Sequence, residues 1–261
     1  MESSLASGPE PAAPAGAEAL APLTEDAFLG GRVRLLQPRF GYRAATDPVL
    51  LAAAVAARPG ERVLDVGCGA GAAAACLAAR VGGLELQGLE LQPAYAALAR
   101  KNLAGAAVWE GDLFAPPAPL VAIGFDWAMT NPPFFDDCDP PAADGGRATA
   151  RRAAASPAEW VAATLRRVRS GGRIAVIHVA RRLPEVLSGL VGAGDVAVLP
   201  LAAREGRDAG RVIVTARKGA KGPFRLAAPL AIHAGPAHVR DEDDFSDAAA
   251  AVLRDAAPLT F

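Results

Sequence analysis

From residue 60 onward, short apolar runs alternate with longer stretches of helical character. The apolar runs predict strands at residues 62–66, 84–90, 106–109, 125–130 and 174–179. Helices are predicted between them, at residues 70–80, 93–103, about 157–169 and 183–191. Strands that alternate with helices are typical of a parallel, doubly wound α/β sheet with helices on both faces.

Two local signals set the limits of the last elements. Ser156-Pro157-Ala158-Glu159 is a capping box with proline at the first helical position, and Gly171-Gly172 is expected to end that helix. Residues 196–201 and 212–217 are two apolar runs around a polar loop, which predicts an antiparallel hairpin. We therefore expect a Rossmann-like, mostly parallel sheet of seven strands with an antiparallel terminal hairpin.

The two ends of the chain differ from this regular part. Residues 1–22 are mostly Ala, Pro, Gly, Ser and Glu without a period, which predicts a disordered tail. Residues 23–57 are interpreted as an N-terminal extension with a helix from Asp47. Residues 58–224 form the main domain, and residues 225–261 are a C-terminal extension of it.

Composition narrows the class of protein. Of 261 residues, 52% are apolar but only 5% are aromatic, so the core is expected to be built from closely packed Ala, Leu and Val. Twenty-seven basic and 28 acidic residues leave a net charge of −1, which excludes a globally basic nucleic-acid binder and an acidic disordered chain.

Membrane and metal chemistry find no support in the sequence. The longest apolar stretch, residues 48–57, is about half the length that spans a bilayer, and the first residues lack a basic signal region. Three cysteines and three scattered histidines show no ligand spacing. We expect a cytoplasmic protein, a monomer or weak dimer, with no membrane and no metal.

A glycine-rich turn follows the first predicted strand of the domain. It is the segment Val63-Leu64-Asp65-Val66-Gly67-Cys68-Gly69-Ala70-Gly71. Glycines allow positive φ and let a ligand approach the backbone closely. Gly67, Gly69 and Ala72 also fit the GxGxxA pattern of a nicotinamide dinucleotide site, and the segment also fits a tight turn without a ligand.

Acidic residues stand near the ends of three successive strands. Asp65, Glu90 and Asp112 each fall at the carboxyl end of a predicted strand, which is the ligand-binding edge of an open α/β sheet. A carboxylate there can accept hydrogen bonds from ribose hydroxyls. Because Asp65 would repel a pyrophosphate, it favours a cationic ligand, and S-adenosylmethionine carries both a sulfonium and an ammonium.

Asn131-Pro132-Pro133-Phe134 follows the fourth strand, at the same edge. The prolines fix φ and hold the turn rigid. The Asn131 side-chain carbonyl and the Pro132 backbone carbonyl can both accept from one NH2 group, and Phe134 offers a face for stacking on a planar base. The pattern predicts in-line methyl transfer to an amino nitrogen, without a dedicated general base.

With these motifs the chain resembles the class I S-adenosylmethionine-dependent methyltransferases that methylate amino groups. More narrowly it resembles the tRNA1(Val) adenine-N6 methyltransferases, which modify the adenosine just 3′ of the anticodon. The resemblance runs from about residue 26 to the end. Besides the motifs above, it rests on residues 28–31, on the segment from Gln37 to Arg43 and on residues 46–51. Position 134 is Phe where many relatives carry Tyr.

The resemblance implies roles for individual residues. Glu90 would bind the cofactor ribose, Asp112 and the Leu113 backbone its adenine, and Asp65 with the glycine loop its methionine end. The segment from Arg43 to Asp47, with Arg43 and Thr46 as contacts, would close over that end. Residues 136–152 are interpreted as a mobile loop beside the active site. The candidate RNA contacts are arginines near the site: Arg39, Arg147, Arg151 and Arg152.

Other functions remain open at this point. A guanine-N2 methyltransferase of ribosomal RNA and a protein-glutamine N5 methyltransferase use the same Asn-Pro-Pro logic. A nicotinamide-dependent oxidoreductase explains the glycines and Glu90 but not Asn131-Pro132-Pro133-Phe134. A non-catalytic RNA-binding module would bind no S-adenosylmethionine.

Overall fold

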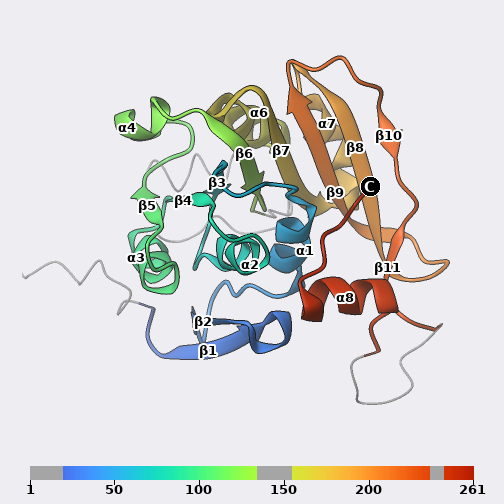
Figure 1. The fold of residues 1–261 in the computed structure, drawn as a ribbon, viewed down its shortest axis with the longest axis horizontal. Coiled ribbons are helices and arrows are strands. Elements are labelled where there is room, and N and C mark those ends of the chain that lie inside the picture. Colours follow the sequence, from blue (N-terminus) through green and yellow to red (C-terminus); the bar gives the residue numbers. More distant parts are fainter. Residues whose placement is uncertain (1–19, 134–154, 236–243) are drawn as a thin grey trace, which may run out of the picture.

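A central β-sheet organises the computed structural model, which describes residues 20–133, 155–235 and 244–261 (Figure 1). Nine strands of the described residues form this sheet, in the order β10-β8-β9-β7-β6-β3-β4-β5, with β11 paired to β8. The strands are β3 (Arg62–Val66), β4 (Glu85–Glu90), β5 (Ala107–Glu110), β6 (Phe125–Thr130), β7 (Val168–Val179), β8 (Ala193–Arg204), β9 (Ala209–Lys218), β10 (Arg225–Leu226) and β11 (Leu230–His233).

The mostly parallel topology is confirmed. Strands β3 to β7 pair parallel to one another, and β9 runs antiparallel to both β7 and β8. The seven predicted strands are therefore present, with the terminal hairpin as expected. The two additional strands, β10 and β11, come from the C-terminal extension. They are only two and four residues long, too short for alternation to identify them.

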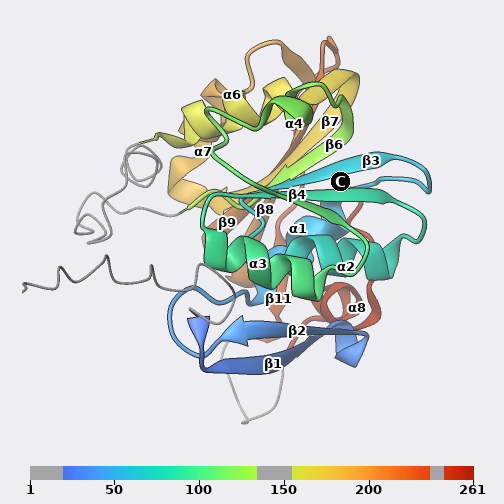
Figure 2. The ribbon, with the colours of Figure 1, turned by 90° about the vertical axis from the view of Figure 1, so that its left-hand side faces the viewer.

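Helices cover both faces of the sheet (Figure 2). One face carries α6 and α7, and the other carries α1, α2, α3 and α8. The helices are α1 (Thr46–Ala54), α2 (Ala72–Arg80), α3 (Pro93–Asn102), α4 (Ala118–Val121), α6 (Pro157–Arg167), α7 (Leu183–Ser188) and α8 (Asp247–Asp255), with short 3-10 turns η2 (Leu29–Gly31) and η3 (Ala180–Arg182). The doubly wound arrangement predicted from the sequence is therefore correct.

The junction between α6 and β7 differs from the prediction. The capping box at Ser156 and Glu159 is present, but α6 ends at Arg167, and β7 begins at once with Val168. Gly171 and Gly172 thus lie inside a strand and do not stop the helix. A Cβ at Gly172 would lie 2.8 Å from the Asp126 carbonyl oxygen, so this glycine permits a close approach of two backbones.

A hairpin that the sequence did not reveal precedes α1. Strands β1 (Leu23–Phe28) and β2 (Val33–Pro38) pair antiparallel and form a separate two-stranded sheet. Asn102 of α3 holds this hairpin to the domain: its side chain accepts from Leu36 N (2.9 Å) and donates to the Leu36 and Ala70 carbonyls. The hairpin is therefore anchored beside the glycine loop. Residues 1–19 of the predicted tail lie outside the described residues.

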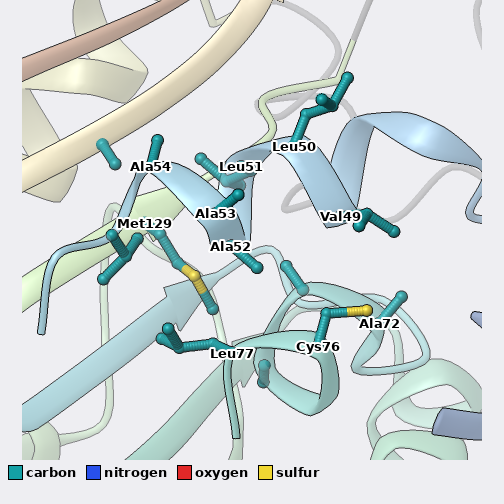
Figure 3. Close-up of a cluster of buried hydrophobic side chains, with 14 of the residues drawn as sticks. Val49, Leu50, Leu51, Ala52, Ala53, Ala54, Ala72, Cys76, Leu77 and Met129 are labelled. Carbon is teal, nitrogen blue, oxygen red and sulfur yellow. The ribbon is translucent and has the colours of Figure 1, made fainter. Parts of the chain in front are cut away.

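Alanine allows close packing of α1 against α2 and the sheet. Ala52, Ala53 and Ala54 of α1 are all at most 4% exposed, and Figure 3 shows α1 facing Leu77 of α2 and Met129 of β6. Helices with such small side chains can lie close to their neighbours. α1 thereby brings the loop that precedes it to the carboxyl edge of the sheet.

The described ranges contain neither a membrane-spanning helix nor a metal-binding cluster. No helix in residues 20–133, 155–235 or 244–261 is long and apolar enough to cross a membrane. The same ranges contain no cluster of three or more His, Cys, Asp or Glu side chains that could hold a metal ion.

Candidate active site

The carboxyl ends of four parallel strands meet at one edge of the sheet. Val66 of β3 is paired with Leu89 of β4 on one side and with Thr130 of β6 on the other, and Glu90 is paired with Glu110 of β5. The structure consequently brings together four side chains that are far apart in the chain: Asp65, Glu90, Asp112 and Asn131.

The glycine loop bends over the end of β4. Gly67, Gly69 and Gly71 have φ values of +70°, +55° and +90°, which L side chains rarely adopt. The N–H groups of Gly67 and Cys68 both donate to the Leu89 carbonyl, at 2.8 and 3.2 Å. The sequence of the loop is thus explained by its backbone conformation.

Glu90 and Asp65 are buried carboxylates, each 2% exposed. Glu90 accepts from Gly69 N at 3.0 Å and from Gln92 N at 2.9 Å, which fixes its side chain against the loop. Asp65 accepts from Ala74 N at 3.2 Å. Burial raises the pKa of Asp65 to about 7; the hydrogen bond from Ala74 N opposes this rise, and the nearby Glu90 carboxylate adds a smaller contribution to it. A cationic ligand would favour its ionised form.

Two hollows lie on either side of Gly67. The first lies toward β4 and β5, and its walls are Gly67, Leu89, Glu90, Leu91, Gly111, Asp112, Leu113 and Trp160. The second lies toward the N-terminal extension, and its walls include Gln37, Tyr42, Pro48, Asp65, Cys68 and Asn131. Both hollows are lined by Gly67, and together they make up the candidate site along the sheet edge.

The first hollow has the chemistry of a nucleoside site. Asp112 accepts from Phe114 N at 2.9 Å, which orders the turn after β5. The indole of Trp160 packs edge-on to Phe114, at 6.1 Å between centroids, and donates to Thr130 Oγ1 at 2.8 Å. Apolar walls together with the Glu90 and Asp112 carboxylates suit a flat base joined to a sugar.

The second hollow contains an acceptor without a partner. Oδ1 of Asn131 is buried, and no group in the described part of the chain donates a hydrogen bond to it. A buried carbonyl oxygen without a donor costs about 1–3 kcal/mol. A ligand with an N–H group would remove that cost. Pro132 beside it is buried as well.

Tyr42 is a site residue that the sequence reasoning missed. It lines the second hollow, and its ring carbon Cε1 lies 3.6 Å from where a Cβ on Gly69 would stand. Burial of its hydroxyl, with Asp47 and Asp65 nearby, raises the pKa of Tyr42 to about 12, and the Asn131 side chain opposes that shift. The residue as a whole is 55% exposed, so part of its surface is open to solvent. A single aromatic in a loop has no spacing to identify it.

Two predicted cofactor contacts line neither hollow. Arg43 does not line either hollow: it pairs with Asp26 of β1, with Nη2 at 2.6 and 2.8 Å from the two carboxylate oxygens. Gln37 donates to the same carboxylate and accepts from Ala44 N, so Arg43 belongs to a network that orders its own loop. Thr46 is the first residue of α1 and lines neither hollow.

The predicted RNA contacts are only partly described. Arg39 is exposed beside the site, with its guanidinium 5.8 Å from the ring centroid of Phe40. Phe40 is itself 73% exposed, so an open aromatic and a cation lie together at this point. Phe134, the interpreted loop 136–152 and its arginines lie outside the described residues: Arg147, Arg151 and Arg152.

Known proteins are similar to this chain. The family model described as methyltransferase small domain matches residues 45–193. A tRNA1(Val) (adenine(37)-N6)-methyltransferase of Dickeya chrysanthemi is 36% identical over 123 residues, 43% of this chain and 47% of the relative. One of Porphyromonas gingivalis is 31% identical over 175 residues, 62% and 68% of the two chains. The match thus spans about half the length of the first relative.

A solved structure supports the fold. A predicted O-methyltransferase from Agrobacterium tumefaciens has a TM-score of 0.66 at 24% identity, over 82% of this chain and 98% of the other. At that identity the likeness concerns the fold alone, which is the Rossmann-like α/β arrangement described above.

Proposed function

Because the chain belongs to the methyltransferase small domain family of class I S-adenosylmethionine-dependent methyltransferases, we propose that it methylates an exocyclic amine of an RNA base. The base is an adenine in the anticodon loop of a tRNA, and the methyl group goes to its exocyclic nitrogen N6. The observation that carries this proposal is the unpartnered, buried Oδ1 of Asn131 in the hollow beside Asp65. An amide oxygen without a donor suits an incoming NH2 group.

The residues at the sheet edge fit the cofactor. When bound, S-adenosylmethionine supplies an electrophilic methyl group on a sulfonium. The Glu90 carboxylate would hold the ribose, and Asp112 with the Leu113 backbone would hold the adenine in the first hollow. Asp65 and the glycine loop, Gly67, Gly69 and Gly71, would hold the cationic methionine end. The segment from Arg43 to Asp47, with Arg43 and Thr46, would close over that end.

Asn131 and Pro132 would orient the target amine. Two carbonyl acceptors on one NH2 group draw its lone pair out of conjugation and aim it along the line of transfer. Positioning of reacting groups about 3–3.5 Å apart can supply several kcal/mol of the barrier reduction. Pro133 keeps the turn rigid, and Phe134 would stack on the base. The methylated nitrogen is acidic and loses its proton to water, so no general base is needed.

The relatives' names support the RNA substrate, because both are tRNA adenine-N6 methyltransferases. A base must leave its stack to enter such a site, and an anticodon loop is already single-stranded. Arginines at the rim would hold the phosphates, since guanidinium groups bind them bidentately: Arg39, Arg147, Arg151 and Arg152. We further propose that the protein is a monomer or weak dimer acting in the cytoplasm, with residues 23–57 and 225–261 as extensions of a catalytic domain at 58–224.

Radioactive methyl transfer tests this function. Purified protein and tritiated S-adenosylmethionine are incubated with total RNA from cells that lack the gene, and the labelled nucleosides are separated. The proposal expects N6-methyladenosine in a single tRNA. N2-methylguanosine in ribosomal RNA would contradict the substrate while keeping the amine chemistry. A parallel incubation with total protein from the same cells tests the protein-glutamine alternative, and labelled glutamine there without labelled RNA would likewise contradict the substrate.

A further inference from the structure

A second charged cleft opens at the opposite edge of the sheet from Asn131. It is formed where β6 and β7 begin and where β9 ends, and it encloses about 1360 Å³ including its open mouth. Asp126 of β6 lines this cleft, whereas Asn131 follows the other end of the same strand. At about 3.3 Å per residue, the two positions are roughly 17 Å apart along β6.

Arginine dominates the lining of this basic cleft. Three carboxylates, Glu61, Asp126 and Asp195, face five arginines: Arg58, Arg169, Arg173, Arg217 and Arg225. Among the residues that the structure describes, two arginines form ion pairs with these acids, Arg169 with Asp126 at 2.5 Å and Arg173 with Asp195 at 3.1 Å. The cleft therefore carries excess positive charge on a chain whose net charge is −1.

Three guanidinium groups in the basic cleft lack a carboxylate side-chain partner within the described residues. Arg217 donates through Nε to the Gly171 carbonyl at 3.0 Å, and Arg225 donates to a terminal carboxylate oxygen of Phe261, the last residue of the chain, at 3.1 Å. Arg58 is exposed, and the nearby Glu61 accepts from its backbone N–H. Because each Arg carries five N–H donors, most donors of this group remain available to an anion.

The backbone of β7 builds one wall of the basic cleft. Between Val168 and Arg173 the register with β6 shifts, so that the residues between them bulge out of the ladder. Gly171, with φ of +76°, and Gly172, which packs on the Asp126 carbonyl, make this excursion possible. Arg169 and Arg173 flank it. The glycine pair thus places arginines on a fixed scaffold.

We propose that the basic cleft binds the phosphate backbone of the substrate RNA, at a part of the RNA remote from the methylated base. This rests on the RNA substrate proposed above. Guanidinium groups bind phosphate bidentately and without reading sequence. A cleft that faces away from the active site adds affinity for a whole folded RNA. A short fragment of the loop would gain no such affinity, because it cannot reach the active site and the basic cleft at once.

RNA binding in the double variant Arg58→Ala/Arg217→Ala tests this proposal. Fluorescence anisotropy with labelled total tRNA is measured between 50 and 200 mM salt, without any methyl transfer. Loss of two phosphate contacts should reduce the slope of log affinity against log salt by about 1.4–1.8 and weaken binding roughly 10- to 50-fold at 0.1 M salt. Cofactor affinity, measured by calorimetry, should remain that of the parent and shows that the variant is folded.

The control Arg34→Ala/Arg100→Ala removes the same charge from β2 and α3 and should change the slope little. An equal loss in this control would assign the effect to net charge and overturn the proposal. An unchanged slope in the cleft variant would overturn it too, as would binding of inorganic tripolyphosphate at the cleft with RNA affinity unaffected. A parent that binds RNA through the cleft but methylates none would instead contradict only the proposed function.

Discussion

The hydroxyl of Tyr42 lies beside the side chain of Asn131, although the two residues are far apart in the chain. Asn131 follows β6, and Tyr42 belongs to the loop between β2 and α1. The Asn131 side chain lowers the pKa of the Tyr42 hydroxyl against the larger effect of its burial, so the two groups interact. Since Oδ1 of Asn131 has no donor in the described residues, the Tyr42 hydroxyl is placed to hold the amide so that this oxygen faces the hollow.

Tyr42→Phe should slow turnover while leaving cofactor binding intact. The change removes one hydrogen-bonding group that orients Asn131, and a net hydrogen bond of about 1 kcal/mol corresponds to roughly a 5- to 10-fold loss of kcat. Steady-state kinetics with saturating RNA, together with calorimetry for S-adenosylmethionine, separates the two effects. A loss confined to KM, with kcat unchanged, would instead make Tyr42 a substrate-binding residue.

Cofactor affinity should depend on pH near neutrality. Because burial raises the pKa of Asp65 to about 7, the carboxyl is protonated below that pH and cannot attract a cationic methionine end. We expect the affinity for S-adenosylmethionine to rise with pH up to about 7 and to fall by up to about tenfold for each unit below it. Asp65→Asn should bind weakly at every pH, with a flat profile. An unchanged profile in that variant would contradict the assignment.

The stability of the ligand-free protein should fall as pH rises, whereas the cofactor affinity should rise. The folded-state pKa of Asp65 lies above its ordinary value of 3.8, so between about pH 4 and 7 the folded state binds more protons than the unfolded state. The free energy of unfolding should therefore fall as pH rises through this window. Thermal melts at pH 5 and 8 measure it, and Asp65→Asn should reduce the difference between the two melts.

Gly71→Ala should destabilise the protein more than an alanine at another positive-φ glycine. At Gly71 a Cβ would lie 2.8 Å from the Leu103 side chain, whereas at Gly60, with a similar φ of +85°, it would meet nothing within 4 Å. We expect about 1 kcal/mol of backbone strain in both variants and a further 1–3 kcal/mol of overpacking at Gly71. Chemical denaturation compares them, and equal losses would contradict the packing argument.

The fold was predictable where local pattern and tertiary structure agree. The strand and glycine turn from Arg62 to Gly71, and the capping box at Ser156, depend on neighbours in sequence. The β1–β2 hairpin was missed because side chains from distant helices hold it, Asn102 above all. Gly171 and Gly172 were misread for a similar reason: Gly171 adopts a positive φ and Gly172 packs on the start of β6, neither of which sequence spacing reveals.

The residues of the candidate site were likewise predicted only in part. The parallel sheet rule was enough to gather Asp65, Glu90 and Asp112 at one edge. It was not enough to place residues from the N-terminal extension, whose position is set by packing. Arg43 was expected at the cofactor, but its pairing with Asp26 could be seen only after the hairpin was known. Tyr42 enters the site through the same loop.

Methyl transfer by Asn131→Ala, compared with the parent on tRNA from cells lacking the gene, tests the central claim most directly. The unpartnered Oδ1 is the acceptor that orients the amine, so its removal should lower the rate of N6-methyladenosine formation by about 100-fold or more, a loss comparable to that of other preorganised polar groups. Affinity for S-adenosylmethionine should stay within about twofold, because the first hollow and Asp65 are unchanged. Undiminished methylation by the variant would contradict the account.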